Sequence, residues 1–468
     1  MNESEPEFRP PPAFRRLAES LEAGGYEAWA VGGALRDELL GLGHGDWDLA
    51  TDARPEEVRR IFRRTVPVGI EHGTVGVLAD DGQLYEVTTF RLDVETDGRH
   101  ATVRFADSIE EDLARRDFTI NALAWRPATH ELRDPFQGRR DLERRVLRAV
   151  GDPSERFAED YLRVLRGLRF AGGLGLSLDP ATDAALRAAS GHLGRLSAER
   201  VREELMKVLS GPTPSAALRL YGEAGALDAW YPEVAETARN DARWELNLAA
   251  VDAIRASRPL LRLVRWLLPE ASAAEESGRD PAGSPAREHG SDREAVGREA
   301  RGLEVLRRLR FSNAEQRRVG RLLRFYLPLV GPMDSSARIR QWLAEVTPDA
   351  ARDLFRLHFA DARAAGGAEK ARYLVAAWRR VHEELLDAPP LSLSDLAVRG
   401  DDLLALGVSP GPAVGLLLDE LHQEVLEDPE LNRLDELLAR ARELIEMAHL
   451  APPSASGERR GESREGGP

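Results

Sequence analysis

Cysteine is absent from the 468-residue chain. Its absence excludes disulfides and all metal or iron–sulfur sites that need thiolate ligands, and it is typical of proteins in a reducing compartment. The sequence also lacks any apolar run of about 18 residues, so it predicts no membrane-spanning helix. Residues 1–12 are acidic and proline-rich, unlike a signal peptide. Together these absences favour a cytoplasmic protein.

Several catalytic signatures are missing as well. The sequence contains no Gly-x-x-x-x-Gly-Lys-Ser/Thr loop, no His-Glu-x-x-His helix and no Gly-x-Ser-x-Gly turn. None of its ten histidines is followed by aspartate. These gaps argue against a P-loop NTPase, a zinc peptidase, an α/β-hydrolase and a phosphohydrolase of the His-Asp type.

The chain has fewer basic than acidic residues: 65 Lys and Arg against 80 Asp and Glu, which gives a net charge of −15. That total by itself argues against a nucleic-acid partner. Local sign matters more than the total for binding a polyanion, however. One segment is rich in arginine: Arg139, Arg140, Arg144, Arg145, Arg148, Arg156, Arg163, Arg166 and Arg169.

The pattern changes along the chain from mixed α/β to helical, so we expect an α+β fold. Two β-rich runs, 74–78 and 84–90, flank Asp80-Asp81-Gly82 and predict a hairpin. From residue 143 onward apolar residues recur at helical spacing. The predicted parts are a disordered leader (1–12), an α/β domain (13–142), a helical segment (143–210), a further helical part (211–270), a disordered insertion (271–301), a last helical part (302–450) and a disordered tail (451–468).

A glycine pair follows the first predicted strand, residues 26–31. Gly32 and Gly33 let the backbone approach a ligand closely, and a helix predicted to begin near Ala34 would point its free N–H groups at an anion. This pattern suits a phosphate site. The alternative is an ordinary glycine turn.

Two aspartates stand one residue apart in the next predicted strand. Residues i and i+2 of a strand share a face, so Asp46 and Asp48 would present adjacent carboxylates. Glu86, in a run expected to pair beside this strand, would be a third. Hard oxygen ligands at this spacing suit one or two Mg²⁺ ions, which also take water and phosphate oxygens. The alternative is a set of solvated carboxylates.

A second cluster comprises Arg115, Arg116, Asp117 and Asn121. We expect the arginines to open a helix whose apolar residues are buried. Arginine pairs well with phosphate oxygens, and an Asp–Asn pair can hold a ribose. The alternative is a charged helix cap.

A third cluster places Asp160 and Arg163 on one face of a predicted helix. The alternative is a surface ion pair of small energetic value. The functional interpretation is recognition of a base. A carboxylate accepts from the exocyclic amine of cytosine or adenine, and a guanidinium donates to ring nitrogens or carbonyls. Uracil and guanine present a carbonyl to the carboxylate, a costly mismatch.

These clusters, in this order, resemble the tRNA nucleotidyltransferase/poly(A) polymerase family, of the bacterial (class II) CCA-adding type. The resemblance covers roughly residues 26–210, and weaker similarity to the family extends to residues 309–313, 400–403 and 410–415. The matching stretches are 31–37, 46–51, 72–75, 86–91, 115–121, 134–136, 159–170 and 199–207.

The resemblance implies a polymerase β-like nucleotidyltransferase head with a five-stranded sheet, then a helical neck, body and tail in a hooked shape. It implies Mg²⁺ as cofactor, CTP and ATP as substrates, and the acceptor stem and 3′ end of tRNA as partner. Carried over to this sequence, Asp46 and Asp48 match metal ligands and Glu86 a third catalytic acid. The implied nucleotide contacts are Gly32, Gly33, Arg36, Arg116, Asp117, Asn121, Asp160, Arg163, Arg166 and Arg169.

The sequence departs from the family in residues 92–105, where the family keeps a flexible loop that helps to switch from adding C to adding A. This segment is slightly short and lacks the usual tyrosine and Arg-Arg-Pro. The alternatives therefore include a CC-adding enzyme, an A-adding enzyme and a poly(A) polymerase. A non-catalytic RNA-binding protein is the alternative of another class. We expect residues 199–207 to be a structural brace.

Overall fold

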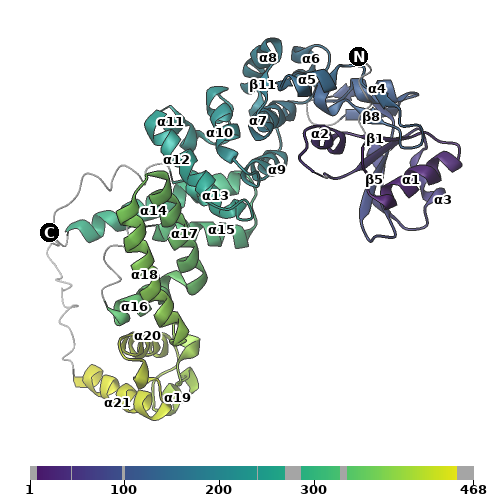
Figure 1. Ribbon diagram of the computed structural model, residues 1–468. Coiled ribbons are helices and arrows are strands. Elements are labelled where there is room, and N and C mark those ends of the chain that lie inside the picture. The colour runs from purple at the N-terminus through teal and green to yellow at the C-terminus, as the bar shows by residue number, and fades with distance from the viewer. Residues whose placement is uncertain are drawn as a thin grey trace, which may run out of the picture. The chain divides into compact units, whose positions relative to one another are not determined.

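The computed structural model describes residues 8–43, 45–96, 101–239, 241–268, 286–326 and 335–450. They form two compact units: Met1–Arg324 with Arg363–Ala365, and Phe325–Ala362 with Gly366–Pro468. The first unit combines a sheet with helices, and the second is helical, so the α+β class is confirmed (Figure 1). No helix within these ranges has both the length and the apolar character needed to cross a membrane.

The N-terminal part of the first unit, the head, is built on a mixed sheet of seven strands in the order β3-β4-β5-β2-β1-β8-β9. The resemblance implies five strands, and the two-residue strands β8 and β9 extend the sheet beyond β1. The strands are β1 (Ala28–Val31), β2 (Asp48–Thr51), β3 (Thr65–Gly69), β4 (Thr74–Leu78), β5 (Leu84–Thr89), β8 (Ala124–Trp125) and β9 (Leu132–Arg133).

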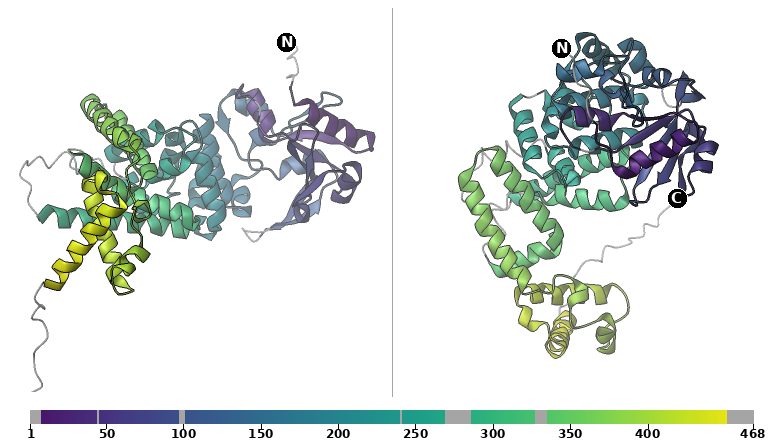
Figure 2. Two further views of the ribbon diagram at one scale, coloured as in Figure 1. Left: turned by 90° about the horizontal axis from the view of Figure 1, so that it is seen from below. Right: turned by 45° about the vertical axis from the view of Figure 1, so that its right-hand side comes forward.

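Helices cover the sheet. Figure 2 shows helix α1 (Pro12–Ala23, purple) lying against the sheet, where Phe14 and Leu17 are buried. The other head helices are α2 (Gly33–Leu39), α3 (Pro55–Ile61) and α4 (Ile109–Ala114). Strands β6 (Arg91–Thr96) and β7 (Ala101–Phe105) form a separate two-stranded sheet. The expected hairpin of β4 and β5 is confirmed.

Strand register determines where the acidic side chains lie. Strands β2 and β5 pair in parallel with Leu49 opposite Val87, and both of these residues are fully buried. Side chains alternate between the two faces of a sheet. Asp48 and Glu86, each one residue earlier, therefore lie side by side on the opposite face.

A helical part follows the head within the first unit, as predicted, apart from the two-residue strands β10 (Val146–Leu147) and β11 (Ser177–Leu178). Phe118 of the head contacts Phe157 and Phe170 at ring-centroid distances of 6.5 and 6.0 Å and so joins the two parts. The helices are α5 (Gly138–Glu143), α6 (Pro153–Glu159), α7 (Leu162–Leu174), α8 (Pro180–Ser190), α9 (Ala198–Leu209), α10 (Pro214–Glu223), α11 (Pro232–Ala238), α12 (Asp241–Ala253), α13 (Pro259–Trp266), α14 (Ala286–Arg308) and α15 (Asn313–Phe325).

The second unit has its own apolar core, which includes Leu403, Leu421 and Leu437. Buried Arg340 donates to the carbonyls of Leu426 and Glu427, which otherwise lack partners at the end of a helix. The helices are α16 (Ser336–Val346), α17 (Pro348–Ala364), α18 (Ala368–Leu386), α19 (Gly400–Ala405), α20 (Pro412–Glu427) and α21 (Leu434–Leu450).

Three segments were expected to be disordered. Of the leader 1–12, residues 1–7 lie outside the described residues, whereas Phe8 is 1% exposed and packs on Trp125. The prediction for 271–301 is wrong from Ala286 onward, because helix α14 begins there and buries Ala295 and Val305. The rest of that segment and the tail 451–468 lie outside the described residues.

Candidate active site

A cavity of about 1000 Å³ opens in the first unit between the head and helices α7 and α9. All thirteen residues that were predicted as catalytic or nucleotide-binding line this one cavity, and so does Arg115 of the second cluster. It is also lined by residues that the sequence did not predict as site residues: Val68, Gly69, His72, Thr74, Arg91, Glu159, Leu162, Phe170, Arg200 and Lys207.

The turn between β1 and α2 brings backbone close to the cavity. Gly32 has a φ of +80°, in the region that favours glycine, and a Cβ there would lie 3.3 Å from Nη1 of Arg116. Helix α2 begins at Gly33, as the glycine pattern predicted. Arg36 extends from this helix and donates to Asp37 and to the amide oxygen of Asn121, both at 2.8 Å.

The acidic end of the cavity contains Asp46, Asp48 and Glu86. Asp46 precedes β2 instead of lying in it, and the intervening Trp47 is buried against Phe14. Burial and the carboxylates of Glu86 and Asp46 raise the pKa of Asp48 to about 6, against the opposing charge of Arg116.

This donor set fits a divalent cation. The carboxylates repel one another at the cavity wall, and a cation among them would relieve that repulsion. Among the described residues, no three His, Asp or Glu side chains form a ready-made metal cage. Mg²⁺ usually binds through one or two carboxylates and fills its remaining positions with water and phosphate oxygens.

The helix expected to open at Arg115 does not form. Helix α4 ends at Ala114, and only a 3₁₀ turn over Thr119–Asn121 follows. Arg115 and Arg116 both pair with Asp112 at the end of α4, at 2.9 and 3.0 Å. The Asp117 carboxylate accepts from the backbone N–H of the next residue at 2.8 Å, which competes with helix formation.

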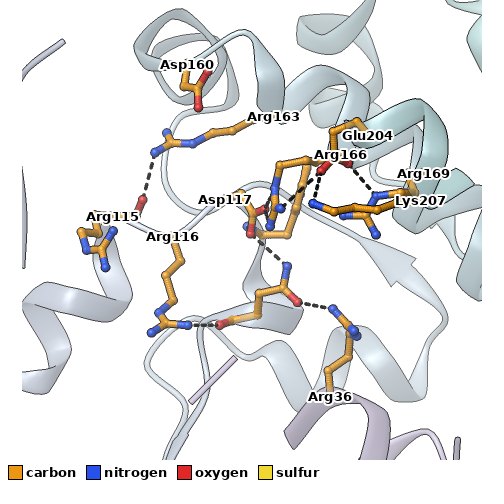
Figure 3. A network of polar contacts seen from close by, with 12 residues as sticks. Arg36, Arg115, Arg116, Asp117, Asp160, Arg163, Arg166, Arg169, Glu204 and Lys207 are labelled. Carbon is orange, nitrogen blue, oxygen red and sulfur yellow. Dashed lines mark hydrogen bonds and ion pairs between the residues drawn. The ribbon is translucent and has the colours of Figure 1, made fainter. Parts of the chain in front are cut away.

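Asp117 joins the head to helix α7 through its pair with Arg166 (Figure 3). Asn121 donates to Asp117 at 2.9 Å, and Arg166 of α7 pairs with the other Asp117 oxygen at 2.7 Å. Burial opposes ionisation of Asp117, but Arg166 and the hydrogen bonds hold its pKa below the usual range. The two side chains thus form the expected fixed pair, and the hold on a ribose stays a prediction.

Asp160 and Arg163 do not share one continuous helix. Helix α6 ends at Glu159, Asp160 is extended, and its carboxylate accepts from the backbone N–H of Leu162 at 3.0 Å to start α7. Asp160 pairs with Arg200 of α9 at 2.6 Å. Arg163 pairs with Glu159 and donates to the Arg115 carbonyl at 3.2 Å. Both still line the cavity.

Helix α9 contributes more than the expected brace. Glu204, only 1% exposed, accepts from Arg169 at 2.6 Å and from Lys207 at 2.9 Å. Burial alone would raise the pKa of Glu204, but Arg169, Lys207 and Arg166 lower it. One signal in the sequence could have revealed this residue, because Glu204 is a charge on the apolar face of α9, next to buried Leu205.

The cavity is basic in an acidic protein. Its lining carries nine Arg or Lys side chains against six Asp or Glu side chains. The chain as a whole has a net charge of −15. Opposite charge concentrated in a cleft attracts anionic ligands.

The sequence and the structure of this chain were compared with those of known proteins. The family model described as "Poly A polymerase head domain" matches residues 28–148, and "Probable RNA and SrmB- binding site of polymerase A" matches residues 175–237. The CCA-adding enzyme of Lacticaseibacillus paracasei is 34% identical over 447 residues, covering 94% of this chain and 98% of that protein.

Two further matches agree. The CCA-adding enzyme of Geobacillus stearothermophilus is 41% identical over 279 residues, 56% of this chain and 67% of that protein. The crystal structure of the Bacillus stearothermophilus CCA-adding enzyme in complex with CTP superposes with a TM-score of 0.71 and 31% identity, covering 94% of this chain and 99% of that one. This chain therefore belongs to the CCA-adding enzyme family and is a nucleotidyltransferase.

Proposed function

We propose that this protein adds C, C and A to the 3′ end of tRNA from CTP and ATP without a nucleic-acid template. One observation carries the proposal: a single cavity is lined by three carboxylates at one end and by a basic cluster with Asp160 and Arg163 at the other. Transfer of a nucleotide needs both, because the α-phosphate reacts at the acidic end while the rest of the nucleotide is held.

Asp46 and Asp48, with Glu86 beside them, would hold Mg²⁺. When bound, Mg²⁺ supplies Lewis-acid stabilisation of the attacking hydroxyl and of the departing pyrophosphate. Arg36 and Arg116 face the Gly32 turn, where they would bind and orient the triphosphate. The 3′ hydroxyl of the tRNA would approach from the acidic side, in line with the pyrophosphate.

Asp160 and Arg163 would select the base. Asp160 would accept from the exocyclic amine of cytosine or adenine, and Arg163 would donate to the neighbouring ring acceptor. The contacts of Asp160 with Arg200 and of Arg163 with Glu159 support this proposal, because they restrict both side chains beside the cavity. Uracil or guanine would leave a carbonyl facing the carboxylate.

The helices after the head would hold the acceptor stem through its phosphates without reading sequence. We also propose that the protein works in the cytoplasm. Its lack of cysteine supports this location.

The test uses tRNAs that end at the discriminator base, at C and at CC, each incubated with one nucleoside triphosphate at a time and Mg²⁺. We expect CTP to extend the first two RNAs and ATP to extend the third, as resolved on a sequencing gel. Addition of C alone, of A alone or of a long A tract would support the CC-adding, A-adding or poly(A) alternative.

The variant Asp48→Asn tests the metal site. We expect incorporation to fall by roughly 1000-fold, since loss of one metal ligand costs several kcal/mol of transition-state stabilisation. Binding of tRNA should remain. The control is Asp80→Asn, an exposed carboxylate on the β4–β5 hairpin. Undiminished turnover by Asp48→Asn would contradict the assignment, and absence of turnover in the wild type would favour a non-catalytic RNA-binding protein.

A further inference from the structure

Three arginines surround a single aromatic ring in the cavity. The guanidinium carbons of Arg36, Arg166 and Arg169 lie 4.9, 5.2 and 4.2 Å from the ring centroid of Phe170. Phe170 is 6% exposed and lines the cavity together with all three. Guanidinium groups at these distances are attracted by the ring quadrupole. A single aromatic ring therefore lies within cation–π distance of three guanidinium groups.

The three arginines come from different elements. Arg36 belongs to helix α2 of the head, whereas Arg166 and Arg169 belong to helix α7, as does Phe170. The ring of Phe170 therefore contacts cations from both walls of the cavity. Replacing this ring would therefore alter the surroundings of Arg36 on α2 and of Arg166 and Arg169 on α7 at the same time.

Each arginine also has its own carboxylate. Arg36 pairs with Asp37 at 2.8 Å. Arg166 pairs with Asp117 at 2.7 Å, and Arg169 pairs with Glu204 at 2.6 Å (Figure 3). A carboxylate fixes one edge of a guanidinium, and the ring fixes its position from a second direction. Because a guanidinium has five N–H donors, the group held in this way keeps donors for a ligand.

We propose that Phe170 is a positioning residue that holds Arg36, Arg166 and Arg169 at fixed separations for the phosphates of the incoming nucleotide. This inference rests on the proposed function. Three like charges around one small cavity repel one another, and without the ring each guanidinium would be held by its carboxylate alone and could turn toward solvent. Several guanidinium groups at defined spacing suit a polyphosphate better than any uncharged ligand.

If Phe170 served only to pack the core, its replacement would lower stability without weakening phosphate binding. The ring also packs edge-on against Phe118 at 6.0 Å, so a smaller residue would leave a gap in the core. Loss of that packing lowers stability but has no specific effect on a phosphate ligand. Phe157 offers the matched control, because it is 1% exposed and contacts the same Phe118 at 6.5 Å. Among the residues that the structure describes, no guanidinium lies over its ring.

The experiment compares Phe170→Leu and Phe170→Met with Phe157→Leu and Phe157→Met in the full chain. Calorimetry with Mg²⁺ measures the Kd of CTP, of ATP and of inorganic triphosphate. Removing cation–π contacts of this kind should raise the Kd of all three ligands by about 5- to 30-fold. We expect KM for CTP to rise in parallel while kcat changes little. The Phe157 variants should lose a similar amount of thermal stability and keep the wild-type Kd.

Phe170→Tyr retains an aromatic face and should restore tight binding. The methionine variant decides the matter if the leucine variant does not fold, because a flexible side chain of similar volume fills the space. The inference is overturned if the Phe170 variants keep the wild-type Kd, if the Phe157 variants weaken binding equally, or if tyrosine is as defective as leucine. Failure of the proposed function would appear separately, as a wild-type protein that binds CTP but does not extend RNA.

Discussion

Asp160 is held from two sides, and this constraint has a consequence for base selection. Its two carboxylate oxygens engage Arg200 at 2.6 Å and the backbone of Leu162 at 3.0 Å. In Arg200→Ala the first contact is lost, and the carboxylate gains freedom to turn. We expect UTP and GTP incorporation to rise roughly 10-fold relative to CTP and ATP, the effect of losing one hydrogen bond to a charged group. Competition assays with paired nucleotides measure this ratio.

The control for that prediction is Arg202→Ala. Arg202 also belongs to α9, but it donates to the Arg310 carbonyl and does not line the cavity. Unchanged selectivity in Arg200→Ala would show that Asp160 does not need this partner.

Asp48 predicts a pH dependence of stability in metal-free protein. Its pKa is raised from an ordinary 3.8 to about 6, so the folded state binds the proton more tightly than the unfolded state. Stability from this group is therefore present at low pH and is lost as pH rises through 6. Asp48→Asn cannot ionise and so avoids the energetic cost of a buried charge. The free energy of unfolding of this variant should therefore exceed that of the wild type by about 1 kcal/mol near pH 4.5 and by about 3 kcal/mol at pH 7.

Thermal unfolding in EDTA at both pH values checks this prediction, with Asp80→Asn as the comparison. Adding Mg²⁺ at pH 7 should narrow the difference, because a cation neutralises the wild-type carboxylate. A stability difference that stays constant with pH would contradict the prediction.

The residues of the site were easier to predict than their contacts. Short motifs of charged residues and glycines identified thirteen site residues, and all of them line one cavity. Their partners could not be predicted, because Arg200 and Glu204 come from a helix about forty residues farther along the chain. The sequence predicts which residues gather, whereas tertiary packing decides which oxygen each arginine contacts.

At the scale of elements, replacing either of two adjacent glycines of α7 by alanine should change stability in opposite directions. A Cβ on Gly172 would overlap the backbone of Ala217 in α10, whereas a Cβ on Gly173 would meet nothing within 4 Å. Gly172→Ala should lower the free energy of unfolding by at least about 2 kcal/mol, since backbone cannot move aside easily. Gly173→Ala should raise it by about 0.5–1 kcal/mol, the difference in helix propensity.

Denaturant unfolding of both variants measures these changes. Because the glycines are neighbours, each serves as the control for the other. Equal effects would mean that α7 and α10 do not approach as closely as the geometry indicates.

Elements with clear periodicity were predicted well, and those shaped by capping were not. The hairpin of β4 and β5 and the long helices followed from side-chain pattern alone. The break at Asp160 depends on a carboxylate that caps α7, and the helix expected at Arg115 is lost where the Asp117 carboxylate accepts from the backbone N–H of Phe118. Helix α14 begins in a segment whose composition indicates disorder, because a few apolar residues such as Ala295 find a core.

At the scale of the whole molecule, the cavity and the second unit are separate in sequence. Every residue that lines the cavity lies between Gly32 and Lys207, within the first unit. The second unit has its own apolar core of leucine, valine and alanine side chains. Nucleotide binding and the holding of RNA are therefore expected to divide between different parts of the chain.

A chain that ends at Phe325, the last residue of α15, tests this division. We expect it to bind CTP with a Kd within about twofold of the full chain, because distant sites contribute independently. Incorporation into tRNA should fall by at least about 10-fold, since phosphate contacts to the acceptor would be lost. Circular dichroism shows whether the shortened chain folds, and calorimetry gives the Kd. A folded fragment that has lost CTP binding would contradict a self-contained nucleotide site, and undiminished tRNA extension would contradict a role of the second unit in holding RNA.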